Sequence, residues 1–269
     1  MNEYRRLAEE IAAAYAQKQQ IPAPTGRETE FNLAAAYATE AELVRMRKNA
    51  GRCTVGLKVG FANRAMWRAL KLETLVWAHI YDDTVRYAVN NEATVSISRM
   101  YAPKIEPEIV FKLRTELPAD ADAAAVLAAV EWIALGFEII DCVYPDWKFA
   151  PTDFVAAYGL HAALVVGSPI HISADQIALV AGQMAAFTIT LEKDGQAVAE
   201  GSGKNSLKSP ALCVAELSSA TRKAGATLGP GSIVSSGTLT EAQFISVGAT
   251  YSAVVKGLGV PPLSVRIVA

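Results

Sequence analysis

Hydrophobic and polar positions follow two different patterns along the chain. Residues 1 to about 50 place apolar residues at helical spacing among Ala, Glu, Arg and Gln, with one break at the proline-containing segment 21–26. Because proline fixes φ and removes a backbone donor, this break predicts a turn between two helices. From Gly51 the pattern changes to short β-rich runs such as CTVGLKVGF, EIVFKL and FEIIDCVY, which Gly, Pro, Asn and Asp separate.

Two helical stretches are expected within the β-rich part. One should run from about Ala119 to Leu135 with Asp120 or Asp122 as its N-cap, and a second covers residues 210–224. Runs of strands with a few inserted helices predict an α+β or mostly β fold rather than a regular βαβ repeat. We therefore expect a helical N-terminal region, residues 1–50, and a β-rich catalytic domain, residues 51–269, that together form one continuous unit.

Composition narrows the class of protein. Of 269 residues, 52% are hydrophobic and 19% are charged, with 25 basic against 27 acidic side chains. Charged residues normally make up about a quarter of a globular chain, so the shortfall predicts a homo-oligomer that buries extra surface. The absence of a basic block argues against nucleic acid as a partner.

The first residues of the chain and its cysteines help to predict the cellular compartment of the protein. The first twenty residues form an amphipathic pattern without the apolar core of a signal peptide, and the longest apolar stretch, residues 123–137, contains Glu131. Three widely spaced cysteines indicate neither a disulfide framework nor a thiolate zinc site. These features predict a cytoplasmic protein that does not enter a membrane.

Two acidic segments are the strongest candidates for a metal site. Side chains alternate faces along a strand, so Glu106 and Glu108 of KIEPEIVF should project on one side, with Pro107 suggesting an edge or a strand start. In FEIIDCVY, Glu138 and Asp141 interrupt an apolar run, where a carboxylate is costly unless it is paired or binds a metal. We favour Glu138 as the third ligand of Mg²⁺ or Mn²⁺, and expect a salt-bridge or supporting catalytic role for Asp141. Solvated carboxylates or buried salt bridges are the alternatives.

Lysines are the second group of candidate catalytic residues, because the chain has only three histidines. Lys58 lies between Gly56 and Gly60 on one face of its strand, so few side chains of its own strand surround it. It is predicted either to bind a substrate carboxylate or to be a surface lysine on an edge strand. Lys148 follows the acidic strand closely and is a further catalytic candidate.

Four segments taken together resemble the hydratase/decarboxylase branch of the fumarylacetoacetate hydrolase superfamily. They are GLKVGFANRAM, PKIEPEIVFKL, FEIIDCVYPDWKF and the C-terminal GPGSIVSSGTLTEAQFISVGATYSAVVKGLG. The resemblance implies the mixed β roll or barrel of that superfamily's C-terminal domain, a bound Mg²⁺ or Mn²⁺, and an oligomer. By the same resemblance, Glu106, Glu108 and Glu138 match the metal ligands and Lys58 matches the active-site lysine.

Two departures from the family pattern bear on the substrate. The family's Asp and Asn positions are here Ala157 and Tyr158, and the later glycine-rich loop carries added lysines at Lys204 and Lys208. The lysines predict either a substrate with an extra carboxylate or a solvated turn that does not contact the ligand, and the missing polar groups leave open that the familiar reaction is lost. His161, close to the gap, is predicted either to contact the substrate as a replacement proton donor or to be a hydrogen-bonded core residue.

The resemblance implies a metal-dependent lyase acting on an unsaturated 2-oxo acid or its 2-hydroxydienoate enol. Hydration, as in 2-keto-4-pentenoate hydratases, and decarboxylation, as in 4-oxalocrotonate decarboxylases, are held about equal. Two alternatives remain: a carbon–carbon bond hydrolase of the same superfamily, which calls for a histidine base, and a non-catalytic homologue that keeps the metal.

Overall fold

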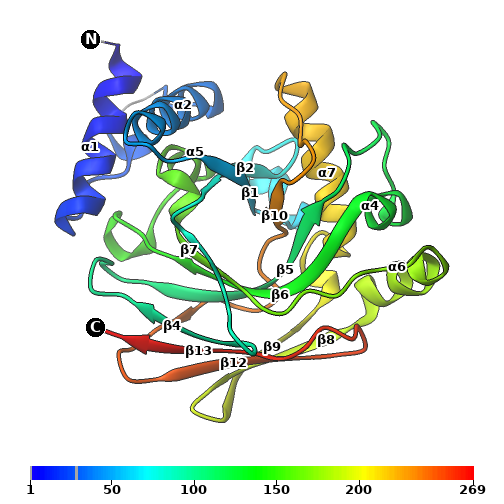
Figure 1. Ribbon diagram of the computed structural model, residues 1–269. Helices are drawn as coiled ribbons and strands as arrows, with labels where there is room; N and C mark the ends of the chain where they lie inside the picture. Colours follow the sequence, from blue (N-terminus) through cyan, green and yellow to red (C-terminus); the bar gives the residue numbers. More distant parts are fainter. Residues whose placement is uncertain (1, 28–29) are drawn as a thin grey trace.

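The computed structural model describes residues 2–27 and 30–269, and begins with the two expected helices. They are α1 (Glu3–Gln17) and α2 (Leu33–Asn49), joined through a short 3-10 turn at residues 24–26. Each helix has an asparagine N-cap, because Asn2 accepts a hydrogen bond from the Tyr4 amide and Asn32 accepts one from Ala35. Figure 1 shows both helices together at one corner of the molecule.

The larger sheet carries the acidic strands at its centre. Its order is β2-β1-β10-β5-β6-β7-β3, and β11 also pairs with β5. The strands are β1 (Thr54–Gly60), β2 (Val76–Tyr81), β3 (Val85–Tyr87), β5 (Lys104–Leu113), β6 (Val130–Ile140), β7 (His161–Val166), β10 (Ile233–Ser235) and β11 (Gln243–Phe244). Neighbours are antiparallel except for the parallel pairs β1–β10 and β3–β7.

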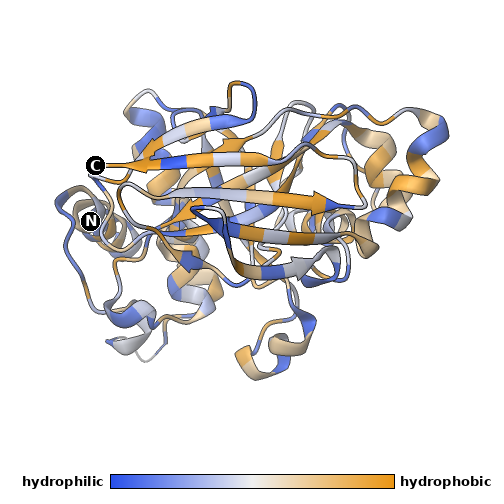
Figure 2. Ribbon diagram, turned by 90° about the horizontal axis from the view of Figure 1, so that it is seen from below, coloured by the Kyte–Doolittle hydropathy of each residue, from blue (hydrophilic) through white to orange (hydrophobic). Residues whose placement is uncertain are grey.

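A second, five-stranded sheet lies beneath the first in Figure 1 and has the order β4-β13-β12-β8-β9. Its strands are β4 (Glu92–Ser96), β8 (Thr188–Lys193), β9 (Gln196–Ser202), β12 (Thr250–Lys256) and β13 (Leu263–Val268). Burial alternates along β13, as expected for a sheet with one face on the core, and Figure 2 shows polar and apolar residues interleaved along these strands. The mixture of helices and curled sheets confirms the predicted α+β class.

The remaining helices cover the sheets. They are α3 (Arg64–Leu70), α4 (Ala123–Ala129), α5 (Pro151–Ala156), α6 (Ile177–Ala186) and α7 (Pro210–Lys223). One contiguous hydrophobic cluster includes Ile11 of α1 and Leu43 of α2 together with residues of both sheets, so the N-terminal helices share the main core. No helix in the described part of the chain combines the length and apolar character needed to cross a bilayer.

The predicted helix over residues 119–135 is wrong in its second half. Asp122 does cap α4 by accepting the Ala125 amide, but the helix ends at Ala129 and β6 begins at Val130. Because β6 lies between β5 and β7 with both faces buried, its sequence is an almost continuous apolar run. Periodicity cannot distinguish such a strand from a buried helix. The short helices α3, α5 and α6 were likewise not predicted.

The edge position that Pro107 suggested is also wrong, because β5 is an interior strand. Pro107 pairs with Phe137 of β6 on one side. On the other side β10 pairs with β5 from Val110 to Lys112 and β11 pairs at Lys104 and Ile105, so Pro107 falls between these two partners. Its carbonyl still accepts a hydrogen bond from the Leu239 amide. A proline is tolerated here because the position requires no backbone donor.

Gly56 is required by the close approach of β1 and β10. A Cβ built on Gly56 would lie 1.8 Å from the Ile233 carbonyl oxygen, which is backbone and cannot rotate away. Gly56→Ala is therefore expected to lower the free energy of unfolding by about 1–3 kcal/mol, and urea denaturation measures this change. Gly182→Ala is the control, because a Cβ there meets nothing within 4 Å, and it should be neutral or stabilising. Equal effects of the two substitutions would contradict this explanation.

Candidate metal centre and active-site cavity

The antiparallel pairing of β5 with β6 brings three glutamates together. Glu106 lies directly opposite Glu138 in the register, and Glu108 follows two residues along β5 on the same face. Each carboxylate can offer one oxygen such that the three oxygens lie within 4.8 Å of one another. Two strands therefore gather three hard oxygen donors into one small volume.

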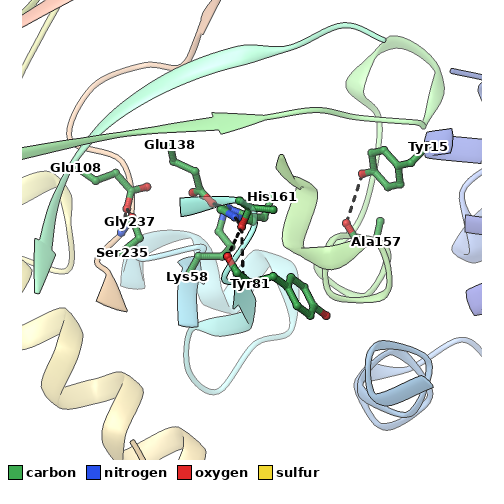
Figure 3. A network of polar contacts seen from close by, with 10 residues as sticks. Tyr15, Lys58, Tyr81, Glu108, Glu138, Ala157, His161, Ser235 and Gly237 are labelled. Atoms are coloured by element: carbon green, nitrogen blue, oxygen red, sulfur yellow. Dashed lines mark hydrogen bonds and ion pairs between the residues drawn. The ribbon is translucent and has the colours of Figure 1, made fainter. Parts of the chain in front are cut away.

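Glu138 is held by a lysine and a histidine. Lys58 Nζ lies 2.7 Å from Glu138 Oε2, and His161 Nδ1 lies 2.7 Å from Glu138 Oε1. The other histidine nitrogen, Nε2, contacts Thr84 Oγ1 at 2.8 Å. Figure 3 shows the Glu138 side chain directed towards Lys58 and His161. Although burial alone would raise the pKa of Glu138, Lys58 and His161 lower it, so this carboxylate stays ionised.

Glu108 is oriented from β10 and the loop after it. Its Oε2 accepts a hydrogen bond from Ser235 Oγ at 2.5 Å and another from the Gly237 amide at 2.8 Å. Its other oxygen, Oε1, is buried without a hydrogen-bond partner in the described part of the chain. A buried carboxylate oxygen is costly in that state. This oxygen is therefore available as a ligand.

The charges of the cluster do not balance. Burial and the neighbouring carboxylates raise the pKa of Glu106 to about 7 and that of Glu108 well above its usual range. Burial opposes the charge on Lys58, but Glu138, Glu106 and Glu108 outweigh it and raise the pKa of Lys58. One buried ammonium thus faces three carboxylates. The donor set and its excess negative charge fit a hard divalent cation such as Mg²⁺, Mn²⁺ or Ca²⁺.

A cavity of about 450 Å³ opens onto this cluster. Its lining includes Lys58 and Glu106, with an apolar wall formed by Phe61, Phe149 and Phe154. Lys58 Nζ lies 4.9 Å from the centroid of the Phe154 ring. The cavity therefore combines charged groups at one wall with aromatic rings that limit access of water, as small-molecule sites commonly do.

The surroundings of Lys58 differ from those predicted. The lysine is 2% exposed and lies on an interior strand, not on an edge. The space above Gly60 is filled by Phe154, since a Cβ there would lie 2.4 Å from that ring. Gly159 covers the lysine stem, because a Cβ there would lie 2.8 Å from Lys58 Cδ. Only the ammonium end of Lys58 is left to act on a ligand.

Two residues predicted to be catalytic lie outside the cluster. Asp141 forms no salt bridge with any of the described residues. Its carboxylate accepts hydrogen bonds from the amides of Tyr101 and Ala102, in the loop before β5, and of Cys142. Lys148 is exposed, and its contact is with Asp146 at 3.4 Å. Neither side chain lines the cavity. Sequence proximity to β6 was misleading because the chain turns away immediately after that strand.

The residues predicted to bind substrate are also placed differently. Lys204 and Lys208 are both exposed, and neither lines the cavity, although Asn205 between them does. His161 is buried with both ring nitrogens engaged, so it positions Glu138 instead of reaching a substrate. This outcome corresponds to the alternative of a hydrogen-bonded core histidine.

Several residues around the cluster were not identified from the sequence. Ser235 ends the short strand β10 and Gly237 lies in the loop after it, within a Ser-Ser-Gly tripeptide that resembles an ordinary turn. Phe154 lies in a helix that was not predicted. Asn205 donates a hydrogen bond to the Leu239 carbonyl at 2.7 Å, which closes one side of the cavity. Only the glycine-rich character of the loop before Asn205 could have drawn attention to it.

Comparison with known proteins identifies the family to which the chain belongs. Residues 63–266 match the fumarylacetoacetate hydrolase C-terminal family. The chain belongs to this family. It is 28% identical over 254 residues to a 4-oxalocrotonate decarboxylase from a Pseudomonas species, with 94% of each chain covered. It is 29% identical to a 2-hydroxypent-2,4-dienoate hydratase from Pseudomonas putida, with 78% of this chain and 92% of the relative covered.

A solved structure extends the similarity to nearly the whole fold. The 4-oxalocrotonate decarboxylase of Pseudomonas putida G7, complexed with magnesium and adipate, superposes with a TM-score of 0.88 at 25% identity. The match covers 99% of this chain and 97% of that one, and so includes the N-terminal helices. The predicted resemblance to the hydratase/decarboxylase branch is confirmed.

Proposed function

We propose that the protein is a divalent-metal-dependent lyase that acts on an unsaturated 2-oxo acid, and that it releases CO₂ from it. The observation that carries the proposal is the cluster of three glutamates from β5 and β6, which reaches the wall of a cavity through Glu106, beside the buried Lys58. Decarboxylation is favoured over hydration because the relatives named decarboxylases align over 94% of this chain, whereas those named hydratases align over 78–87%.

Glu106, Glu108 and Glu138 would hold the ion, which we propose to be Mg²⁺ or Mn²⁺. When bound, the ion would supply a Lewis acid for the 2-oxo and carboxylate oxygens of the substrate. Ser235 and the Gly237 amide fix the direction of Glu108. His161 fixes Glu138 in the same way, and supports of this kind tune both ligand geometry and affinity.

Lys58 supplies a proton donor at the wall of the cavity. Because its pKa is raised by the surrounding carboxylates, Nζ keeps its proton at neutral pH. It can donate a hydrogen bond to negative charge that develops on the substrate as the carbon–carbon bond breaks. Phe61 and Phe154 exclude water from the same region, which strengthens this interaction.

The hydrolase alternative has less support in the cavity. A hydrolytic mechanism of that kind calls for a histidine base, yet among the described residues that line this cavity none is a histidine. The proposal also includes assembly into a homo-oligomer, to which the low charged fraction points.

A substrate panel tests the proposed activity. Metal-free protein is supplied with Mg²⁺ or Mn²⁺ and assayed with 2-oxo diacids and 2-hydroxydienoates, following CO₂ release and loss of ultraviolet absorbance separately. We expect metal-dependent CO₂ release from a 2-oxo-enedioate. Water addition without CO₂ would establish the hydratase instead, and no turnover of any substrate would favour a non-catalytic homologue.

The stabilisation by metal should depend on pH. In the metal-free protein the folded pKa of Glu106, about 7, lies above the unfolded value of about 4.3. The proton-linked stability from this group is present below the unfolded pKa and is lost as pH rises towards 7. Because cations compete with protons for the carboxylates, the increase in Tm caused by saturating Mg²⁺ should grow between about pH 5.5 and 8. A Tm increase that is constant over this range would contradict the prediction.

A further inference from the structure

A second cavity lies on the other side of His161 from the glutamate cluster. Its volume is about 650 Å³, within the usual range of small-molecule sites, and it opens between α1, α2, the end of β2 and the start of β7. It shares no lining residue with the cavity at the glutamates. His161 and Thr84 line it, so the hydrogen-bonded pair that supports Glu138 forms part of its wall.

Three tyrosine rings give this cavity flat apolar walls. The ring of Tyr158 is edge-on to that of Tyr15, with 5.9 Å between centroids, and to that of Tyr81, with 6.2 Å. Ala12 and Ala162 add small apolar side chains to the lining. Aromatic faces and edges arranged in this way favour a planar ring as the guest. Figure 3 shows the Tyr81 ring directed away from the Lys58–Glu138 contact.

Tyr81 also offers an unsatisfied hydrogen-bond donor. The residue is 2% exposed, and its hydroxyl has no hydrogen-bond partner among the described residues. Burial raises the pKa of Tyr81, so the hydroxyl remains protonated and can donate. Buried hydroxyls are normally paired, and one left unpaired beside a cavity indicates a position for an acceptor atom of a ligand.

The charged residues around this cavity favour an anion. Lys18, Arg47 and Arg99 all line it, and the Arg47 guanidinium lies 4.6 Å from the centroid of the Tyr81 ring. Arg47 is paired with Asp83, whereas Arg99 forms no ion pair within residues 2–27 and 30–269. Asp141 is the acidic residue of the lining, and its oxygens already accept backbone amides. The cavity therefore has cationic donors without a competing free carboxylate.

We propose that this cavity binds a small aromatic carboxylate, with the ring among the three tyrosines and the carboxylate near Arg99, Arg47 and the Tyr81 hydroxyl. The site is distinct from the metal centre, and the proposal does not depend on the proposed reaction. The three tyrosine rings of the lining favour an aromatic acid over inorganic phosphate, because phosphate would leave the aromatic surface uncovered.

The test uses 4-fluorobenzoate as the probe and follows its binding to the full-length, Mg²⁺-loaded protein by fluorine NMR, with excess pyruvate present to occupy the metal centre. Tyr81→Phe and Arg99→Gln should each weaken binding about tenfold, since each removes one charge-assisted hydrogen bond. Neutral 4-fluorobenzyl alcohol should bind at least about tenfold more weakly than the acid. Arg52→Gln is the matched control for Arg99→Gln. Arg52 pairs with Asp83, as Arg47 does, but it does not line the cavity, so this variant should bind the probe normally.

Three results would overturn the proposal. They are absence of probe binding to the wild-type protein, unchanged affinity in both Tyr81→Phe and Arg99→Gln, and binding that is seen without pyruvate but is lost as pyruvate is added, which would place the probe at the metal centre. Tyr81→Phe removes a single oxygen atom that has no hydrogen-bond partner in the part of the chain that the structure describes, so the variant is expected to fold normally.

Discussion

Glu108→Gln should remove divalent-cation binding while leaving the fold intact. The substitution keeps the shape of the side chain and its acceptor for Ser235 and Gly237, but it removes the charge from the buried, unpartnered oxygen. Loss of residues that merely support metal ligands already weakens metal binding by about 10–100-fold, so loss of a ligand charge should exceed about a hundredfold. Calorimetric titration with Mn²⁺ measures this change, and turnover should fall with it.

The stability of the metal-free variant separates a ligand from a structural residue. Because burial and the neighbouring carboxylates raise the pKa of Glu108 and so favour its neutral form, Glu108→Gln should be about as stable as the wild type before metal is added. Glu241→Gln is the matched control, because Glu241 lines the same cavity but does not belong to the cluster. Equal Mn²⁺ affinity in Glu108→Gln and wild type would refute the assignment of Glu108 as a ligand.

Lys58→Met should abolish turnover without weakening metal binding. The ammonium is the cationic group in contact with Glu138, and its removal takes away a proton donor worth about 10²–10⁴ in rate. A positive charge next to a bound cation is repulsive, so its loss should leave Mn²⁺ affinity equal or higher. Turnover and Mn²⁺ titration of the same preparation test both statements.

Stability gives a further check on Lys58. Breaking a buried ion pair by removing one partner costs about 3–5 kcal/mol, and this cost should appear in the metal-free variant. Added Mg²⁺ should restore much of the lost stability, because the ion neutralises the same carboxylates. Lys112→Met is the control, since Lys112 lies on the same sheet but pairs with Glu131 at the surface. Turnover that survives in folded Lys58→Met would show that the lysine is structural only.

The grouping of the three glutamates could be predicted from the sequence because it depends on strand geometry. The alternation of side chains along β5 fixes Glu106 and Glu108 on one face whatever the rest of the fold does. Glu138 was identified because a carboxylate in an apolar strand requires a partner. What the pattern could not supply was the register between β5 and β6, which places Glu138 opposite Glu106.

Two of the errors have a common physical origin in tertiary burial. Residues 130–135 look helical because β6 is buried on both faces, and Lys58 looks exposed because the glycines beside it are covered by Ile233 and Phe154 from distant segments. Lys148 was expected near the cluster because it follows β6 closely, but a turn directs it into solvent. The errors at β6 and Lys58 concern contacts between segments far apart in the chain, which local patterns do not encode, whereas the error at Lys148 comes from a local turn that was not predicted.

Titration of the metal-free protein with Mn²⁺, followed by electron paramagnetic resonance, tests the metal centre most directly. The account predicts one bound Mn²⁺ per chain, competition by Mg²⁺, and a changed spectrum when a 2-oxo acid such as pyruvate is added, because the acid would occupy free coordination positions. Absence of bound Mn²⁺, or a bound-Mn²⁺ spectrum that 2-oxo acids leave unaltered, would contradict it.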